Sequence, residues 1–186
     1  MDIMINTPLT YEKIKKLKAG DRILLSGTIY SARDAAHKRL IGLLDEGKEL
    51  PINIKDEAIY YVGPTPAKEG QVIGSAGPTT SYRMDDYSPR LLDLGLKAMI
   101  GKGARNEEVL NSIIKNKAIY LGAIGGAAAL ISKRIVASEI IAYEDLGAEA
   151  IRKMEVKDMP LIVIIDTEGN NLYKLGQEEY LRTAKN

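Results

Sequence analysis

The sequence contains no cysteine, and this absence excludes several kinds of site. Disulfide bonds cannot form, and the chain has no thiolate ligand for zinc or for an iron–sulfur cluster. Its single histidine, His37, cannot form a histidine-rich metal site. An iron–sulfur cluster associated with this protein would therefore have to be bound by another chain.

A large excess of charge of one sign and a long apolar run are also missing. Lysine plus arginine number 26 and aspartate plus glutamate 25, so the net charge of +1 gives no reason to expect nucleic acid or an anionic membrane as partner. The longest uncharged run, Ala118 to Ser132, is shorter than the roughly 20 residues that span a bilayer, and we expect it to be a core segment. The first residues include an early acid and no basic stretch before an apolar run, so no secretory signal and a cytoplasmic location are expected.

The remaining composition is that of an ordinary folded chain. Its 186 residues are 45% apolar, enough for a sizeable core, and a single domain over residues 1–186 is expected. Short apolar strands alternate with helices, most regularly from Ser88 onward, which indicates an α/β fold. Strands are expected at residues 3–5, 22–30, 58–62, 72–74, 97–100, 118–121, 134–137 and 161–165, and helices are expected to start near Thr10, Asp34, Ser88 and Asn106.

The segment GPTTSYRMDDYSPR, residues 77–90, has the densest group of polar side chains. Gly77-Pro78 predicts a rigid turn that holds the hydroxyls of Thr79 and Thr80. Threonines in such turns usually bond to the backbone, and a threonine acts as a base only when a neighbouring group favours its ionised form. Two adjacent aspartates, Asp85 and Asp86, could bind a metal, but without further ligands they are more typical of a solvated turn or a helix cap.

Three cations each lie beside a turn or a glycine: Arg33, Arg83 and Lys102. The planar fork of an arginine suits a carboxylate, and a lysine between two glycines allows a ligand to approach the backbone. Together they could clamp a small dicarboxylate. The alternative is that the arginines form ordinary ion pairs, Arg83 with Asp85 or Asp86 and Arg33 with an acid close by, while the lysine is simply exposed. The spacing leaves both interpretations open.

His37 follows Asp34, the expected cap of the second helix, by one turn. A lone histidine in the first turn of a helix is more often packed or solvated than catalytic. Because the histidine side chain titrates near neutral pH, His37 nevertheless remains a candidate for proton transfer.

Several segments, in this order, resemble the β subunit of the two-subunit class I fumarases and L-tartrate dehydratases. They are SARDAAHKR, YYVGPTP, GSAGPTTSYRMDDY, GKG, AIYLGAIGGAAALISKRI and LGAEAIRKMEVKDMPLIVIIDTEGN. The resemblance covers about residues 10–175, and GPTTxxRMD is its most specific motif. It implies a swivelling β/β/α three-layer domain, which is the C-terminal domain of single-chain relatives. It also implies a [4Fe-4S] cluster held by three cysteines of an α subunit, which agrees with the absence of cysteine here.

The implied function is that of a hydro-lyase, active only with the cluster-bearing α subunit in an α2β2 heterotetramer. The expected reaction is the reversible hydration of fumarate to L-malate, in which the open iron acts as a Lewis acid. An L-tartrate dehydratase β subunit and a non-catalytic module that binds small anions are the alternatives.

The resemblance also implies roles for individual residues. Arg33, Arg83 and Lys102 match the carboxylate-binding positions, and Thr79 matches the base that removes the C3 proton, with His37 as a further catalytic candidate. Thr80 is expected at the substrate, and the supporting positions are Asp34, Gly77, Pro78 and Asp85.

Overall fold

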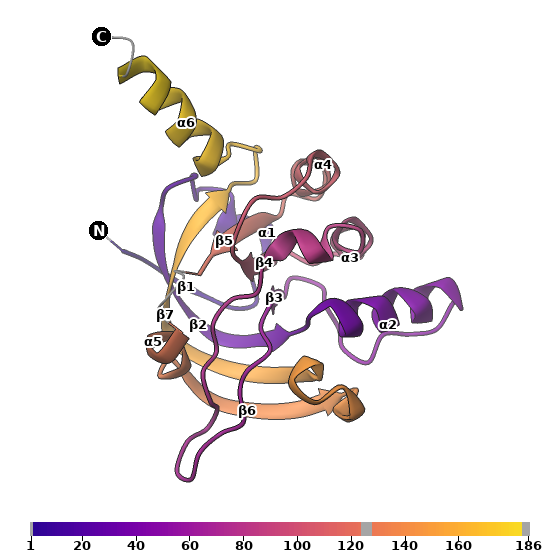
Figure 1. Cartoon of the computed structure of the whole chain (residues 1–186). Coiled ribbons are helices and arrows are strands. Elements are labelled where there is room, and N and C mark those ends of the chain that lie inside the picture. Colours follow the sequence, from indigo (N-terminus) through magenta and orange to yellow (C-terminus); the bar gives the residue numbers. More distant parts are fainter. Residues whose placement is uncertain (1, 124–127, 184–186) are drawn as a thin grey trace.

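A computed structural model describes residues 2–123 and 128–183 of the chain (Figure 1). Its strands are β1 (Ile3–Asn6), β2 (Arg22–Ser31), β3 (Ala58–Tyr60), β4 (Ala98–Gly101), β5 (Ile119–Gly122), β6 (Ile135–Ala142) and β7 (Ile151–Ile165). Its α-helices are α1 (Tyr11–Ile14), α2 (Asp34–Asp45), α3 (Ser88–Asp93), α4 (Glu107–Asn116), α5 (Ala128–Ser132) and α6 (Leu172–Thr183), with 3-10 turns η1 (Ser81–Met84) and η2 (Glu144–Glu149).

Five of the strands in the described residues close into a barrel. The strands β2, β3, β4 and β5 are parallel neighbours in that order. β7 runs antiparallel and pairs with β5 on one side and with β2 on the other, so the ring is complete. β1 adds to the ring beside β2, and β6 adds beside β7. Ring closure satisfies the backbone groups that an open sheet would leave at its edges.

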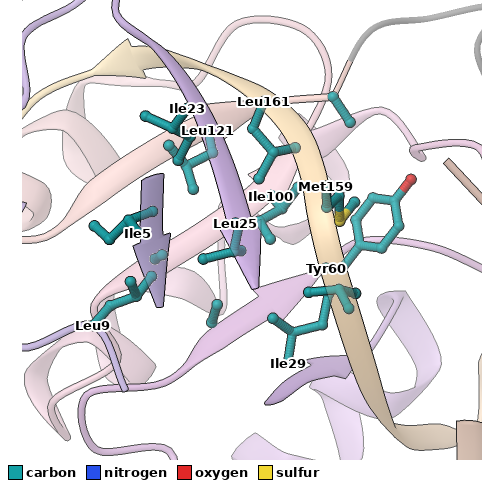
Figure 2. Close-up of a cluster of buried hydrophobic side chains, with 14 of the residues drawn as sticks. Ile5, Leu9, Ile23, Leu25, Ile29, Tyr60, Ile100, Leu121, Met159 and Leu161 are labelled. Atoms are coloured by element: carbon teal, nitrogen blue, oxygen red, sulfur yellow. The ribbon is translucent and has the colours of Figure 1, made fainter. Parts of the chain in front are cut away.

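The barrel interior is filled by alternate residues of these strands. Figure 2 shows Ile23, Leu25 and Ile29 of β2 in the barrel interior, beside Met159 and Leu161 of the neighbouring strand β7. All five side chains are buried. Successive residues of a strand point to opposite faces. Every second residue of each strand therefore points into the barrel, and the residues between them point outward.

The outer face of β3, β4 and β5 packs against a layer of helices. Ile59, Met99 and Tyr120 point outward and join a second buried cluster with residues of α2, α3 and α4, such as Leu40 and Ile113. Figure 1 shows these three helices on one side of the strands. The predicted α/β class and the layered β/β/α arrangement are confirmed.

Three expected strands differ clearly from the structure. The strand expected at 134–137 is the start of β6, which continues to Ala142. The strand expected at 161–165 is the end of β7, which starts ten residues earlier at Ile151. Charged residues and Pro160 obscure that strand in the sequence, and Asp158 interrupts its regular geometry with a left-handed φ of 51°. The strand expected at 72–74 is absent, because this stretch forms bends within a loop. No helix of the described residues is long and apolar enough to cross a membrane.

Parallel pairing brings the carboxyl ends of β2, β3 and β4 to the same rim of the barrel. The residues that follow these three strands therefore lie close together although they are far apart in the sequence. In parallel α/β sheets, ligands bind at this edge. Arg33 follows β2, Gly63 follows β3 and Lys102 follows β4.

A substitution of Gly27 tests the backbone geometry at the pairing of β2 with β7, which closes the barrel. Gly27 lies at a bulge in the β2–β7 pairing with φ of 107°, and a Cβ at this position would overlap the Thr7 hydroxyl. We expect Gly27→Ala to lower the free energy of unfolding by about 2–4 kcal/mol, measured by urea denaturation. Gly42→Ala is the matched control, because Gly42 lies in α2 with nothing within 4 Å of a Cβ, and it should stabilise by about 0.5–1 kcal/mol. Equal effects of the two changes would contradict the assignment of strain to Gly27.

Candidate functional site

Arg33 lies where β2 ends and α2 begins. It is the N-cap residue of α2, and its side chain passes over Gly63, which follows β3. A Cβ on Gly63 would be 2.6 Å from Arg33 Nη1, so only glycine allows the guanidinium to take this path. The glycine of the YYVGPTP motif therefore contributes to the site by leaving room for the Arg33 side chain.

The segment 77–85 crosses the rim of the barrel. It begins at Gly77, and Pro78 forms an isolated bridge with Val62 beyond β3. The Thr79 N–H donates to the Tyr61 carbonyl at 2.7 Å. On its other side this segment contacts the residue that follows β4.

Backbone contacts join this segment to Lys102. The Ser81 N–H donates to the Lys102 carbonyl at 2.9 Å, and Thr80 forms a parallel bridge with Lys102. These two contacts place Thr79 and Thr80 next to Lys102 on the rim.

Thr79 and Lys102 are available to a ligand. Lys102 is exposed and Thr79 is half-buried. Within residues 2–123 and 128–183, the Thr79 hydroxyl has no hydrogen-bond partner and the Lys102 ammonium has no ion-pair partner. Lys102 also lines a cavity of about 320 Å³, together with Gly101, Gly122, Ala123, Ile162, Ile164, Leu172 and Tyr173.

Each of the two arginines is held by an acid of the same chain. Arg83 in η1 pairs with Asp34 in the first turn of α2, and not with Asp85 or Asp86 as the ion-pair interpretation proposed. This pair ties the segment 77–85 to the helix that starts at Arg33. Asp34 does not cap its own helix, whose N-cap residue is Arg33.

Arg33 pairs with Glu149, a residue that sequence reasoning missed. Its Nη2 atom lies 3.4 Å from Glu149 Oε1, and the other carboxylate oxygen accepts from the Ala35 N–H at 3.0 Å. Glu149 is the last residue of η2 and is brought to the rim by the β2–β7 pairing. It belongs to the LGAEA motif, but nothing in its sequence neighbourhood indicates a contact with a residue 116 positions away.

Asp85 forms a buried ion pair with Arg105, the second residue that sequence reasoning missed. Arg105 Nε donates to Asp85 Oδ1 at 2.6 Å, and the two side chains are 0% and 6% exposed. Burial by itself lowers the pKa of Arg105, but Tyr61 and Asp85 more than offset this and raise it above its ordinary value. The only signal in the sequence is the position of Arg105 directly before Asn106, the N-cap of α4.

His37 lies in the protein interior, next to the backbone of Arg33. Its side chain is fully buried between the rings of Tyr61 and Tyr87. Nδ1 lies 2.9 Å from the Arg33 carbonyl, which can only accept, so Nδ1 carries the proton. Burial lowers the pKa of His37 to about 4, although the hydrogen bond to Arg33 favours the charged ring. The imidazole is therefore neutral at physiological pH.

The chemistry of the rim is that of an anion site. It presents two arginine forks together with a lysine and a threonine hydroxyl that have no partner among residues 2–123 and 128–183, a set suited to a small molecule with two carboxylates. The residues do not fit a cluster or metal site, because the chain has no cysteine and the described residues contain no group of three or more potential ligands.

Comparison with known proteins gives the family. A family model described as the fumarase C-terminus matches residues 1–176. The anaerobic class I fumarate hydratase of Escherichia coli is 42% identical over 164 residues, which cover 87% of this chain and 30% of that protein. The aerobic class I fumarate hydratase of Salmonella typhimurium is 39% identical over 174 residues, covering 91% of this chain and 30% of that protein.

A relative of matching length is also found. A Methanocaldococcus jannaschii protein provisionally named L(+)-tartrate dehydratase subunit beta is 38% identical over 172 residues, covering 89% of this chain and 88% of that protein. The chain thus spans only 30% of the two fumarate hydratases but most of this third relative.

The burial of His37 predicts a pH dependence of stability. Between about pH 6.5, the ordinary pKa of histidine, and the folded value of about 4, the unfolded chain binds a proton that the folded chain does not. The free energy of unfolding should therefore fall as the pH is lowered through this window, by about 2 kcal/mol from pH 7 to pH 5 on account of His37. Urea denaturation at pH 7, 6 and 5 should show this part of the slope in the wild type and not in His37→Gln. Identical slopes for the two proteins would contradict it.

Proposed function

The chain belongs to the fumarase C-terminus family, and on this premise we propose that it is the substrate-binding half of a hydro-lyase that hydrates fumarate reversibly to L-malate. The observation that carries the proposal is the placement of Arg33, Lys102 and Thr79 on one rim of the barrel, to which Arg83 is joined by its ion pair with Asp34. In this proposal residues 1–186 act as one hydro-lyase β-subunit domain.

The cations bind the two carboxylates of the substrate. Arg33 is paired with Glu149 and Arg83 with Asp34, so both side chains are oriented before the substrate arrives. Each guanidinium retains N–H groups beyond those used by its acid partner and can donate them to a carboxylate. Lys102 has no acid partner in the described residues and supplies a third positive charge. The proposed dianion is thus bound by three cations, two of which are each paired with a carboxylate of this chain.

Thr79 is the proposed base for the proton at C3. The hydroxyl first gives its own proton to a group of the proposed partner, and the resulting alkoxide accepts the C3 proton. The cations on the adjacent backbone provide part of the stabilisation of the alkoxide. The backbone of Thr79 is fixed by its bond to Tyr61, which holds the hydroxyl in place. Thr80 supports the same geometry through its bridge to Lys102.

His37 receives a different role from the catalytic one expected from the sequence. Its ring is buried, neutral and bonded to the carbonyl of Arg33. We assign it to fixing the backbone of Arg33, where β2 turns into α2. Proton transfer is left to Thr79 and to groups of the partner.

The proposed partner is an α subunit that binds the [4Fe-4S] cluster. This chain has no cysteine to hold such a cluster, and the anaerobic class I fumarate hydratase of Escherichia coli is about three times as long as this chain. An α2β2 heterotetramer in the cytoplasm is the proposed assembly. The charge of a dicarboxylate held between the two subunits would draw them together and exclude water from the site.

L-Tartrate is the second candidate substrate. The observation that favours it is the Methanocaldococcus jannaschii relative, which this chain matches over 88% of its length. Tartrate carries one more hydroxyl than malate and the same two carboxylates, so Arg33, Arg83 and Lys102 do not distinguish the two.

The proposal predicts that activity requires two chains. The tagged chain, purified anaerobically from its own host together with its partner, should hydrate fumarate or dehydrate L-tartrate, whereas the isolated chain should be folded and inactive. The ratio of the two turnover rates assigns the substrate. Turnover by the isolated chain would refute the shared site, and a complex inactive on both compounds would favour a non-catalytic anion-binding module.

Arg83→Met tests the carboxylate contact. Loss of one charged contact should cost about 2–4 kcal/mol, which lowers kcat/KM of the complex about 30- to 1000-fold. Arg90→Met is the matched control, since the Arg90 side chain is 45% exposed and Arg83 is 44% exposed, and each pairs with one aspartate. The control should retain activity within about twofold, because Arg90 lies on α3 and pairs with Asp45. Equal losses in both variants would count against a substrate role for Arg83.

A further inference from the structure

Arg105 lies beneath the rim and contacts both segments that carry the proposed substrate residues. Its guanidinium is stacked between Tyr61 and Tyr120, with the central carbon 5.4 and 5.1 Å from the two ring centres. Nε donates to Asp85, and Nη2 donates to the Ser88 hydroxyl at 2.7 Å. The side chain is 0% exposed, so it cannot touch a ligand on the rim.

The Asp85 carboxylate binds the two segments together. One oxygen accepts from Arg105, and the other accepts from the Asn106 N–H at 2.8 Å, where α4 begins. Asp85 directly follows η1, which contains Arg83. The segment that follows Lys102 is thus bonded at two points to the segment that follows Thr79.

The Tyr120 hydroxyl makes a second connection between the same segments. It donates to the Gly103 carbonyl at 2.9 Å and lies 2.9 Å from the Ser81 hydroxyl, which can donate to it. Gly103 and Ser81 are the immediate neighbours of Lys102 and Thr80. Tyr120 itself is on β5, a rigid wall of the barrel.

We propose that Arg105, Asp85 and Tyr120 form a positioning unit that fixes the separation of Lys102 from Thr79 and Arg83. The proposal rests on the substrate role of those three residues given above. A buried ion pair is weak as a source of stability, because desolvation of the charges offsets their attraction. Its directional hydrogen bonds, however, allow only one arrangement of the two segments, as a catalytic geometry requires.

Tyr120→Phe tests the unit with the smallest change. The phenyl ring still covers Arg105, and only the two hydrogen bonds of the hydroxyl are lost. In the full isolated chain, amide hydrogen exchange within residues 79–85 and 101–105 should become about tenfold faster, the size expected for one or two lost hydrogen bonds. In the active complex kcat should fall at least about tenfold while KM changes less, since binding charges remain and their alignment is lost.

Ser26→Ala is the matched control. The Ser26 hydroxyl also makes two hydrogen bonds, both with Asp158, but it lies in the middle of β2, where the strand pairs with β1. It should lower the melting temperature about as much as Tyr120→Phe and leave exchange at the rim and kcat within about twofold of the wild type.

A paired substitution separates positioning from folding. Arg105→Met combined with Asp85→Leu replaces the buried ion pair by apolar side chains, and such replacements often preserve stability. The double variant should melt close to the wild type and still lose at least about tenfold in kcat. Wild-type exchange at residues 79–85 and 101–105 in both Tyr120→Phe and the double variant would overturn the positioning unit. A wild-type complex inactive on fumarate and L-tartrate would overturn the proposed function instead, and the exchange rates would still decide the positioning unit.

Discussion

The antiparallel pairing of β2 with β7 is the interaction on which the rest of the structure depends. It closes the ring that starts at β2 and passes through the parallel strands β3, β4 and β5. The same pairing aligns Ser31 at the end of β2 with Arg152 near the start of β7. Residues just after β2 therefore face residues just before β7, and Arg33 meets Glu149 as a direct consequence of this register. Barrel closure and the orientation of a proposed substrate arginine thus have one physical cause.

The charges at the rim divide into two kinds by their exposure. The pairs of Arg33 with Glu149 and of Arg83 with Asp34 are partly open to solvent, where an ion pair contributes little to stability. Such a pair can orient a side chain and still leave it able to bind a carboxylate. The pair of Arg105 with Asp85 is buried, so its desolvated charges have to stay together. The exposed pairs suit binding, and the buried pair suits the support of the backbone beneath it.

The described residues of the rim include cations but no group of three potential metal ligands, and this agrees with the shared active site proposed above. In the proposed site, two arginines paired with acids, a lysine and a threonine hydroxyl bind the small dianion, but none of them activates a carbon–oxygen bond strongly. The proposed partner would supply that chemistry.

The sequence by itself determined the fold class, the family and the rim cations, because apolar periodicity and specific motifs such as GPTTxxRMD are local features. It placed the apolar cores of most strands, but it missed ten residues of β7, where charges and Pro160 mask the strand pattern. It also could not predict the pairing of Arg33 with Glu149 or of Asp85 with Arg105. These contacts join residues 116 and 20 positions apart, and only the register of the closed barrel and the crossing of the segment 77–85 bring them together. Tertiary structure likewise decided the state of His37, because burial rather than residue type keeps its imidazole neutral.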